Sequence, residues 1–306
     1  MRRLVQILVA SLTVLALVVP VAALAKDKKK DPDAIGERDV GRGLNLYSLE
    51  KEIALGKELA QEIERQAKII DDPVIAEYVN RVGQNLVRNS DAKVPFTIKV
   101  IDSDEVNAFA LPGGYVYVHT GLLATVESES ELASVLGHEI GHIVARHGLK
   151  NFKRAQKYQF IVGLVNLGVG AIGGEGASAR VGQTISQLLA AGIFTKHSRD
   201  AEREADFLGL HTMYAAGYDP RGMISMFEKL ERLSRRNPDL LGFVFRTHPP
   251  ASERIRNTQA EITDHLALDP RLVRDTPAFS MMKRRLRELR FARNAESSPW
   301  RRRRLR

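Results

Sequence analysis

Two histidines and a glutamate stand in a pattern that could hold and use a metal ion. His138 and His142 are four residues apart, and Glu139 follows the first of them. On a helix, such histidines share one face about one turn apart, so both imidazoles could bind a single Zn²⁺. Glu139 would then face the water that the metal holds and could act as its general base. By residue frequencies, about one such chain in a hundred would match by chance, so further residues must support the pattern.

A third protein ligand has to come from elsewhere in the chain. Metzincins have a histidine six residues after the second motif histidine, and Gly148 occupies that position here, which excludes that class. The alternative is a carboxylate on a later helix, with an acid four residues on to orient a ligand imidazole. Glu202 and Asp206 have this spacing. Glu204, between them, is expected to be a solvated helix acid.

Composition limits the alternatives. The chain has 306 residues and no cysteine, which excludes disulfides, thiolate metal sites and cysteine nucleophiles. Any metal must therefore be held by histidine and carboxylate. The formal charge of +9 resides in residues 283–306, which contain eleven Lys or Arg and two Glu, so the rest of the chain is neutral. A nucleic-acid groove is not expected on such a body.

The first 25 residues have the layout of an export signal. Arg2 and Arg3 precede an apolar run over 4–25, which ends in Ala-Leu-Ala, a fitting peptidase site before Lys26. A retained membrane anchor is the alternative, because the run is long enough to span a bilayer. Either reading predicts that the body of the protein lies outside the cytoplasm.

Helical and strand periodicities predict the elements that would position these residues. Helices are expected over 47–70 and 73–86, strands over 96–100 and 108–119, and further helices over 128–146, 199–216 and from the turn at 217–220 to about 233. Ser128 and Glu131 have capping-box spacing at the start of the metal-binding helix, and Gly148 is expected to end it. The fold class predicted is α+β, mainly helical, with a small sheet beside the active-site helix.

Four ordered motifs resemble one known family. They are Asn107–Gly114, His138–His142, Ser198–Gly209 and Thr247–Pro249. Together they resemble the HtpX, BepA and CAAX prenyl protease group of zinc peptidases, the forty-eighth metallopeptidase family. The resemblance covers roughly residues 45–262 and is closest to the exported BepA-like branch. From this sequence no tetratricopeptide domain is expected, whereas the BepA pattern includes one.

The resemblance implies a zincin-type gluzincin domain with His138, His142 and Glu202 as zinc ligands and Glu139 as base. It also implies a role for His248, which either donates to the oxyanion of the reaction or occupies the fourth zinc position and holds the enzyme off. Arg254 is either a partner of the ligand groups or a surface arginine.

Substrate contacts are expected before the zinc helix. Gly113 and Gly114 would let an extended peptide approach, and a short strand containing Asn107 and Phe109 could pair with its main chain. An ordinary hairpin turn is compatible with the same residues. The other histidines are interpreted as structural or solvated, namely His119, His147, His197, His211 and His265.

These features predict an exported, periplasmic zinc endopeptidase that hydrolyses misfolded or misassembled envelope proteins. The alternative is an autoinhibited, chaperone-like or membrane-associated binding protein, whose Arg-rich tail would contact an anionic membrane surface. The expected organisation is a signal peptide over 1–25, a flexible leader over 26–44, a protease domain over 45–265 and a basic, partly disordered extension over 266–306. Within the domain, a hydrophobic glycine-rich segment over 163–192 is either a packed helical hairpin or a mobile cover.

Overall fold

A computed structural model describes residues 34–38, 40, 48–155, 192–236, 248 and 252–297 of the chain, with side chains to residue 293. Its elements are α2 (Leu49–Gln66), α3 (Pro73–Arg88), β1 (Thr97–Ile101), β2 (Ala108–Leu111), β3 (Tyr115–His119), α4 (Thr120–Thr125), α5 (Glu129–Val144), α8 (Arg199–Ala215), α9 (Arg221–Arg236), α11 (Ser252–His265) and α12 (Pro277–Ser297). The predicted class, mainly helical α+β with a small sheet, is confirmed. The predicted signal peptide and glycine-rich segment lie outside the described residues, as does most of the leader.

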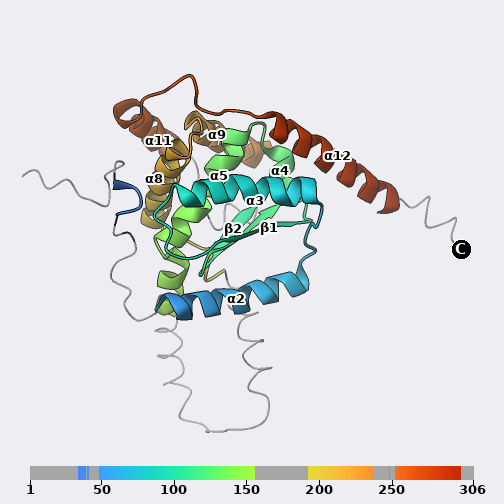
Figure 1. Cartoon of the computed structure of the whole chain (residues 1–306), viewed down its shortest axis with the longest axis horizontal. Helices are drawn as coiled ribbons and strands as arrows, with labels where there is room; N and C mark the ends of the chain where they lie inside the picture. Colours follow the sequence, from blue (N-terminus) through green and yellow to red (C-terminus); the bar gives the residue numbers. More distant parts are fainter. Residues whose placement is uncertain are drawn as a thin grey trace, which may run out of the picture.

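The three strands form a mixed sheet between two helical layers (Figure 1). The strand order is β1-β3-β2, with β1 parallel and β2 antiparallel to β3, so β2 is an edge strand. Alternate side chains point to opposite faces of a strand. Val116 and Val118 accordingly pack with α3 and α5 in the main core, whereas Tyr117 packs with Leu59 of α2 in a smaller one.

Side-chain caps define where the helices begin. The hydroxyl of Ser128 accepts a hydrogen bond from the backbone N–H of Glu131 at 3.2 Å, so the predicted start of α5 is confirmed. The Glu131 carboxylate accepts from the N–H of Glu127 and pairs with Lys229 at 2.6 Å. This buried pair ties the beginning of α5 to α9.

The end of α5 differs from the prediction. The helix stops at Val144, Arg146 adopts a left-handed φ of 55°, and the chain re-enters a helix at residue 147. Gly148 lies inside that new helix and does not end α5. A left-handed residue other than glycine costs roughly 1–2 kcal/mol. The Arg146 guanidinium binds the buried carboxylate of Glu52 on α2, with Nε and Oε2 2.8 Å apart, and this contact offsets the strain.

Glycines let α5 and α8 approach closely. A Cβ on Gly209 would lie 2.7 Å from the backbone nitrogen of His138, and one on Gly141 would lie 2.9 Å from the carbonyl oxygen of Ala205. Both distances are shorter than ordinary contacts allow, so the crossing requires the absence of side chains at these positions. The crossing brings the second half of α5 against the middle of α8.

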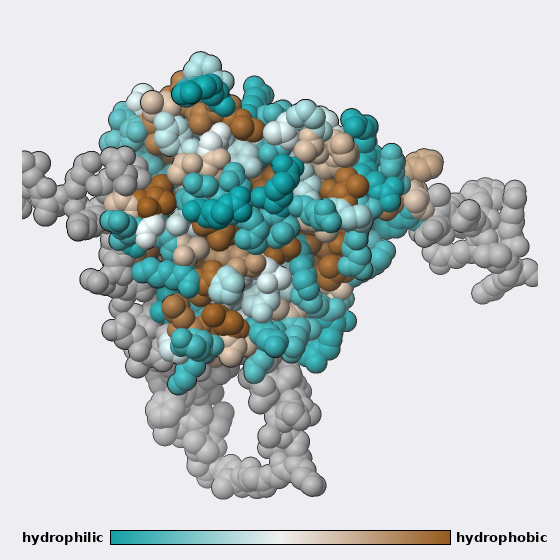
Figure 2. Space-filling view, in the orientation of Figure 1, coloured by the Kyte–Doolittle hydropathy of each residue, from teal (hydrophilic) through white to brown (hydrophobic). Residues whose placement is uncertain are grey.

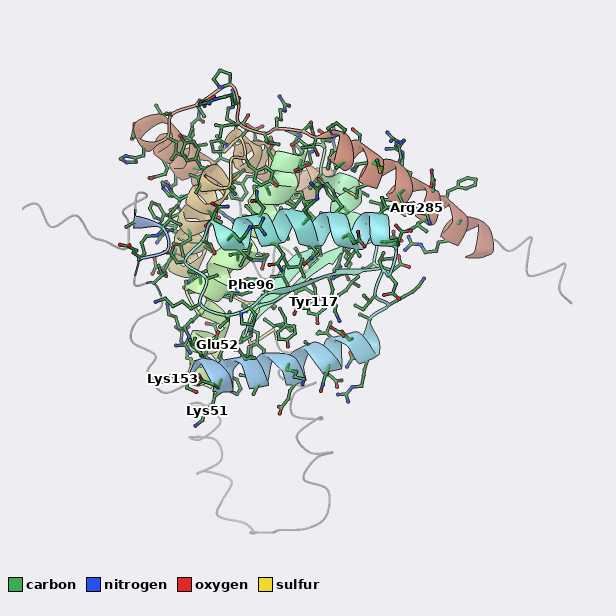
Figure 3. The ribbon with its side chains drawn as sticks, viewed as in Figure 1. Lys51, Glu52, Phe96, Tyr117, Lys153 and Arg285 are labelled. Carbon is green, nitrogen blue, oxygen red and sulfur yellow. The ribbon has the colours of Figure 1, made fainter. Side chains whose placement is uncertain are left out.

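The C-terminal part of the described chain corrects the expected boundary at residue 265. Phe279, Met282 and Leu286 of α12 are buried in the main core, so the fold continues to this helix. Arg285 pairs with Asp72 at the start of α3, with 2.7 Å between Nε and Oδ2 (Figure 3). The buried apolar residues of α12 recur at helical spacing, so one face of the helix packs on the core and the basic residues lie on the others.

The surface is mostly hydrophilic on the face seen in Figure 2, with apolar residues in separate patches. Phe291 on α12 is 77% exposed, the most exposed of the large apolar side chains described. Within the described ranges, no helix combines the length and the apolar character needed to cross a membrane.

Candidate metal centre

The α5–α8 crossing brings three potential ligands together in the interior. His138 and His142 project from one face of α5, and their Nε2 atoms are 3.0 Å apart. Glu202, in the first turn of α8, places Oε1 3.3 Å from Nε2 of His142 and Oε2 3.5 Å from Nε2 of His138. All three residues are buried, with at most 6% of their surface exposed. Their free electron pairs therefore converge on one point.

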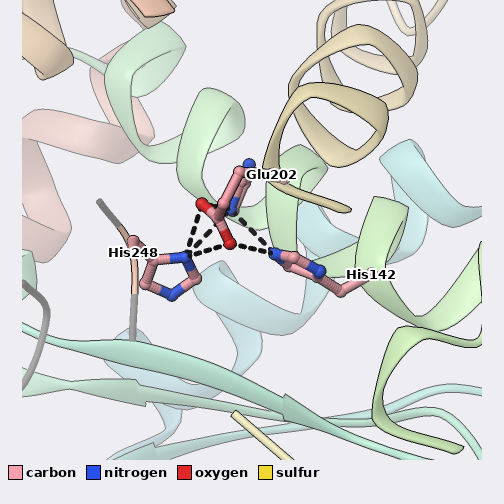
Figure 4. Close-up of side chains that lie close together, drawn as sticks. His142, Glu202 and His248 are labelled. Atoms are coloured by element: carbon pink, nitrogen blue, oxygen red, sulfur yellow. Dashed lines mark hydrogen bonds and ion pairs between the residues drawn. The ribbon is translucent and has the colours of Figure 1, made fainter. Parts of the chain in front are cut away.

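His248 completes the group from the segment before α11 (Figure 4). Its Nδ1 donates to the Glu202 carboxylate, at 2.9 Å from Oε2 and 3.0 Å from Oε1, and lies 3.3 Å from Nε2 of His138. Its Nε2 is 3.8 Å from Oε1 of Glu139. Ligand atoms of His138, His142, Glu202 and His248 all lie within 4.8 Å of one another. His248 thus occupies the open side of the three-residue cluster.

A hydrogen-bonded acid orients the first imidazole. Nδ1 of His138 donates to Oδ1 of Asp206 at 2.8 Å, which leaves the Nε2 electron pair facing Glu202. Asp206 also accepts from Nε and Nη2 of Arg254, at 2.7 and 2.6 Å. The Arg254 side chain is only 11% exposed and lies 3.5 Å from Glu202, so it is a partner of the cluster.

Burial and mutual charge set the protonation of the cluster. Burial raises the pKa of Glu202, but His248 and the other imidazoles outweigh it and hold that pKa far below its ordinary value. Burial lowers the pKa of His142 well below 6.5, and nearby His197 lowers it further. Burial raises the pKa of Glu139 above its usual range. Neutral imidazole together with an ionised carboxylate is the donor set that suits Zn²⁺, so these residues fit the ion.

Two residues that sequence reasoning treated as structural or solvated contact His142 directly. Nδ1 of His147 lies 2.8 Å from Nδ1 of His142, and the ring of His197 stacks on His142 with centroids 3.8 Å apart. Glu204 is a helix acid whose side chain is 40% exposed, and it also accepts from Nε2 of His147 at 3.0 Å, a contact that the sequence did not predict. No spacing rule could have predicted the contact between His147 and His142, because it depends on the left-handed turn at Arg146.

The predicted substrate residues separate into two groups. Asn107 is 3% exposed, and no described residue satisfies its Oδ1. It lines a cavity of about 50 Å³ together with His138, Glu139 and His248. Asn107 therefore stays beside the candidate site with an unused hydrogen-bond acceptor.

The other predicted substrate residues face away. The Phe109 ring stacks on Tyr117 with centroids 5.3 Å apart, on the α2 side of the sheet. Gly113 and Gly114 are buried with φ of 77° and 95°, and a Cβ on Gly114 would lie 1.9 Å from the carbonyl oxygen of Pro95. These glycines permit a tight packed turn, the hairpin-turn alternative that the sequence also offered.

Comparison with known proteins assigns the chain to a family. Residues 73–262, from α3 to α11, match Peptidase family M48. The chain belongs to this family. The M48 match spans every residue of the cluster described above.

Relatives of this M48 chain extend beyond the matched domain. It is 32% identical over 268 residues to the beta-barrel assembly-enhancing protease of Yersinia pestis, covering 83% of this chain and 53% of the relative. It is 31% identical to the mitochondrial metalloendopeptidase OMA1 of Arabidopsis thaliana, over 71% of this chain and 43% of the relative. Metalloprotease YcaL of Escherichia coli K12 is 27% identical, over 73% of this chain and 86% of the relative. The chain thus spans about half the length of the beta-barrel assembly-enhancing protease it matches.

Proposed function

We propose that this M48 chain is a zinc endopeptidase of the periplasm that hydrolyses misfolded or misassembled envelope proteins. The observation that carries the proposal is the convergence of His138, His142 and Glu202 beside the buried carboxylate of Glu139. The proposed location follows from the export-signal layout of residues 1–25. The proposed substrates follow from the assembly-enhancing proteases to which the chain is similar.

His138, His142 and Glu202 would hold the zinc ion, and Asp206 keeps His138 in the tautomer that can bind it. When bound, zinc supplies Lewis acidity that polarises the scissile carbonyl and makes water acidic near neutral pH. Glu139 then takes the proton from the attacking water and delivers it to the departing amine. Burial raises the pKa of Glu139, and a more basic carboxylate accepts the proton of the attacking water more readily.

The edge of the sheet offers a place for the peptide. Strand β2 has β3 on one side, and its neighbour α5 bears the proposed base. An extended substrate could add its main chain to such an edge, which gives affinity with little demand on sequence. Oδ1 of Asn107, which accepts no bond from a described residue, would receive an N–H from that peptide.

His248 would block access to the candidate metal centre. It donates to Glu202 and crowds Nε2 of His138, so it occupies the side from which water or a substrate carbonyl must approach. Of the two roles inferred from the sequence, this contact favours inhibition over oxyanion stabilisation. The active form would then require His248 to move away.

Cleavage of unfolded casein by the zinc-loaded full chain tests the proposal. Wild-type protein should cleave it, and Glu139→Gln should retain zinc while cleaving at least ~10²-fold more slowly, because the base is lost but no ligand is removed. Glu253→Gln is the matched control, since Glu253 is a half-exposed acid outside the cluster. Equal cleavage by the Glu139 variant would refute the proposed base, and unfolded-protein binding without cleavage by wild type would favour the chaperone-like alternative.

A further inference from the structure

A series of hydrogen bonds links three side chains, starting at Nδ1 of His142, the ring nitrogen that faces away from Glu202. Nδ1 of His142 lies 2.8 Å from Nδ1 of His147, and Nε2 of His147 lies 3.0 Å from Oε2 of Glu204. Both histidines are buried, at 2% and 3% exposure, whereas the Glu204 side chain is 40% exposed. Nζ of Lys150 is 3.9 Å from the same Glu204 oxygen. The hydrogen-bond series therefore runs from the interior of the candidate site to a carboxylate near solvent.

The donor and acceptor of each hydrogen bond in this series can be assigned from the chemistry of the atoms. A carboxylate oxygen at this distance accepts, so the hydrogen bond to Glu204 places the proton of His147 on Nε2. A neutral His147 then has a bare Nδ1, which can only accept from Nδ1–H of His142. His142 in turn has a bare Nε2, and this atom faces Glu202 and His138. The opposite tautomer of His142 would put a proton where a metal has to bind.

We propose that His147 and Glu204 are positioning residues that hold His142 in its metal-binding tautomer and ring orientation. The proposal rests on the proposed zinc function for the identity of the metal. Asp206 does the same for His138 through a direct contact. The two imidazoles of the motif are thus oriented by different routes, one by a carboxylate and one through a second imidazole.

The break at the end of α5 is what makes this arrangement possible. In an uninterrupted helix, a residue five positions after His142 would lie roughly 140° around the axis and could not reach its ring. The left-handed Arg146 turns the chain back, so His147 faces His142 from the next helix. The ion pair between Arg146 and the buried Glu52 stabilises that turn. The strained residue, Arg146, therefore lies at the turn that brings His147 to His142.

Zinc affinity of a matched pair of variants tests the proposal. His147→Asn keeps an acceptor oxygen near the place of Nδ1, and His147→Leu has nearly the same shape without an acceptor. We expect His147→Leu to raise the zinc Kd about 10- to 100-fold, measured by competition with a chelator, and His147→Asn to stay within roughly threefold of wild type. Equal affinities of the two variants would overturn the proposal.

A second variant covers the case in which His147→Leu does not fold. Glu204→Ala removes a partly exposed acid, and Asp200→Ala removes an 88% exposed acid from the same helix as its control. In metal-free protein labelled with ¹⁵N-histidine, wild type and Asp200→Ala should give a single Nδ1–H tautomer at His142. Glu204→Ala should give a mixture of both tautomers. An unchanged tautomer would contradict the proposal even if zinc binding were normal.

Metal stoichiometry separates this inference from two other outcomes. Ligand atoms of His142, His147 and His197 also lie within 4.8 Å of one another. A second zinc per chain that is lost in His197→Ala would overturn the proposal, because Nδ1 of His142 could not then donate to His147. Absence of zinc from wild type would instead refute the proposed function, while the tautomer measurement would still test the contact.

Discussion

At the scale of single residues, Glu202 is required by two competing partners. The proposed zinc ion needs its carboxylate, yet His248 donates to both carboxylate oxygens in this structure. Burial lowers the pKa of His248, but the Glu202 charge outweighs it and raises that pKa above 6.5, which favours the protonated ring. Because the same oxygens attract both a proton and a metal, we propose that the position of His248 controls access to the site.

Replacing His248 by Ala distinguishes the two roles inferred for it. If His248 keeps most molecules closed, the variant should cleave casein with a kcat/KM higher by roughly tenfold or more, since the competent form no longer has to be released. A fall of ~10² or more would contradict the account and would mean that the histidine stabilises the oxyanion. Steady-state kinetics at saturating zinc measures the difference.

At the scale of elements, the sequence predicted the parts that follow from spacing. The start of α5 at Ser128, the shared face of His138 and His142, and the small sheet all follow from local patterns. The contact between His147 and His142 could not be predicted, because it requires a left-handed arginine whose stabilising partner is 94 residues away. Sequence alone also could not distinguish glycines that admit a ligand from glycines packed in a turn.

His119, at the junction of β3 and α4, makes the stability depend on pH. Burial lowers its pKa to about 4 from 6.5, so it is neutral in the folded protein at pH 5 to 6 but protonated when unfolded. The unfolded state therefore binds more protons, and stability should fall as pH falls from 6.5 to about 4. This group alone accounts for a loss of up to about 3 kcal/mol.

Urea unfolding of wild type and His119→Leu at several pH values between 4 and 7 measures that contribution. The free energy of unfolding should fall less steeply toward acid in the variant, because the titrating group has been removed. Parallel curves would show that His119 is solvated in the folded protein, contrary to its 7% exposure.

At the scale of the whole molecule, the charge run at the C-terminus has two expected roles. Its first part, α12, packs on the body through Phe279 and Met282, and its arginines pair with acids of α3 and the loop after β1. Residues 301–304 are four consecutive arginines outside the described part of the chain, and the alternatives for them are a solvated tail or binding to an anionic membrane surface. The count of basic residues alone does not distinguish the packed helix α12 from the arginines that follow it.

Two truncations separate these roles. Deleting residues 298–306 should leave the melting temperature unchanged and abolish salt-dependent binding to phosphatidylglycerol liposomes. Deleting residues 277–306 should lower the melting temperature strongly, because burial of each large apolar side chain of α12 contributes roughly 1.5–3 kcal/mol. Liposome binding that survives the shorter deletion, or a fold unaffected by the longer one, would contradict these assignments.

The metal content of the purified full chain tests the central claim most directly. Elemental analysis after removal of loosely bound ions should find one zinc per chain in wild type and in His265→Ala, whose side chain is 57% exposed. It should find little zinc in a variant that carries both His142→Ala and Glu202→Ala and remains folded by circular dichroism. Wild-type protein without stoichiometric metal, or a double variant that keeps its zinc, would contradict the account.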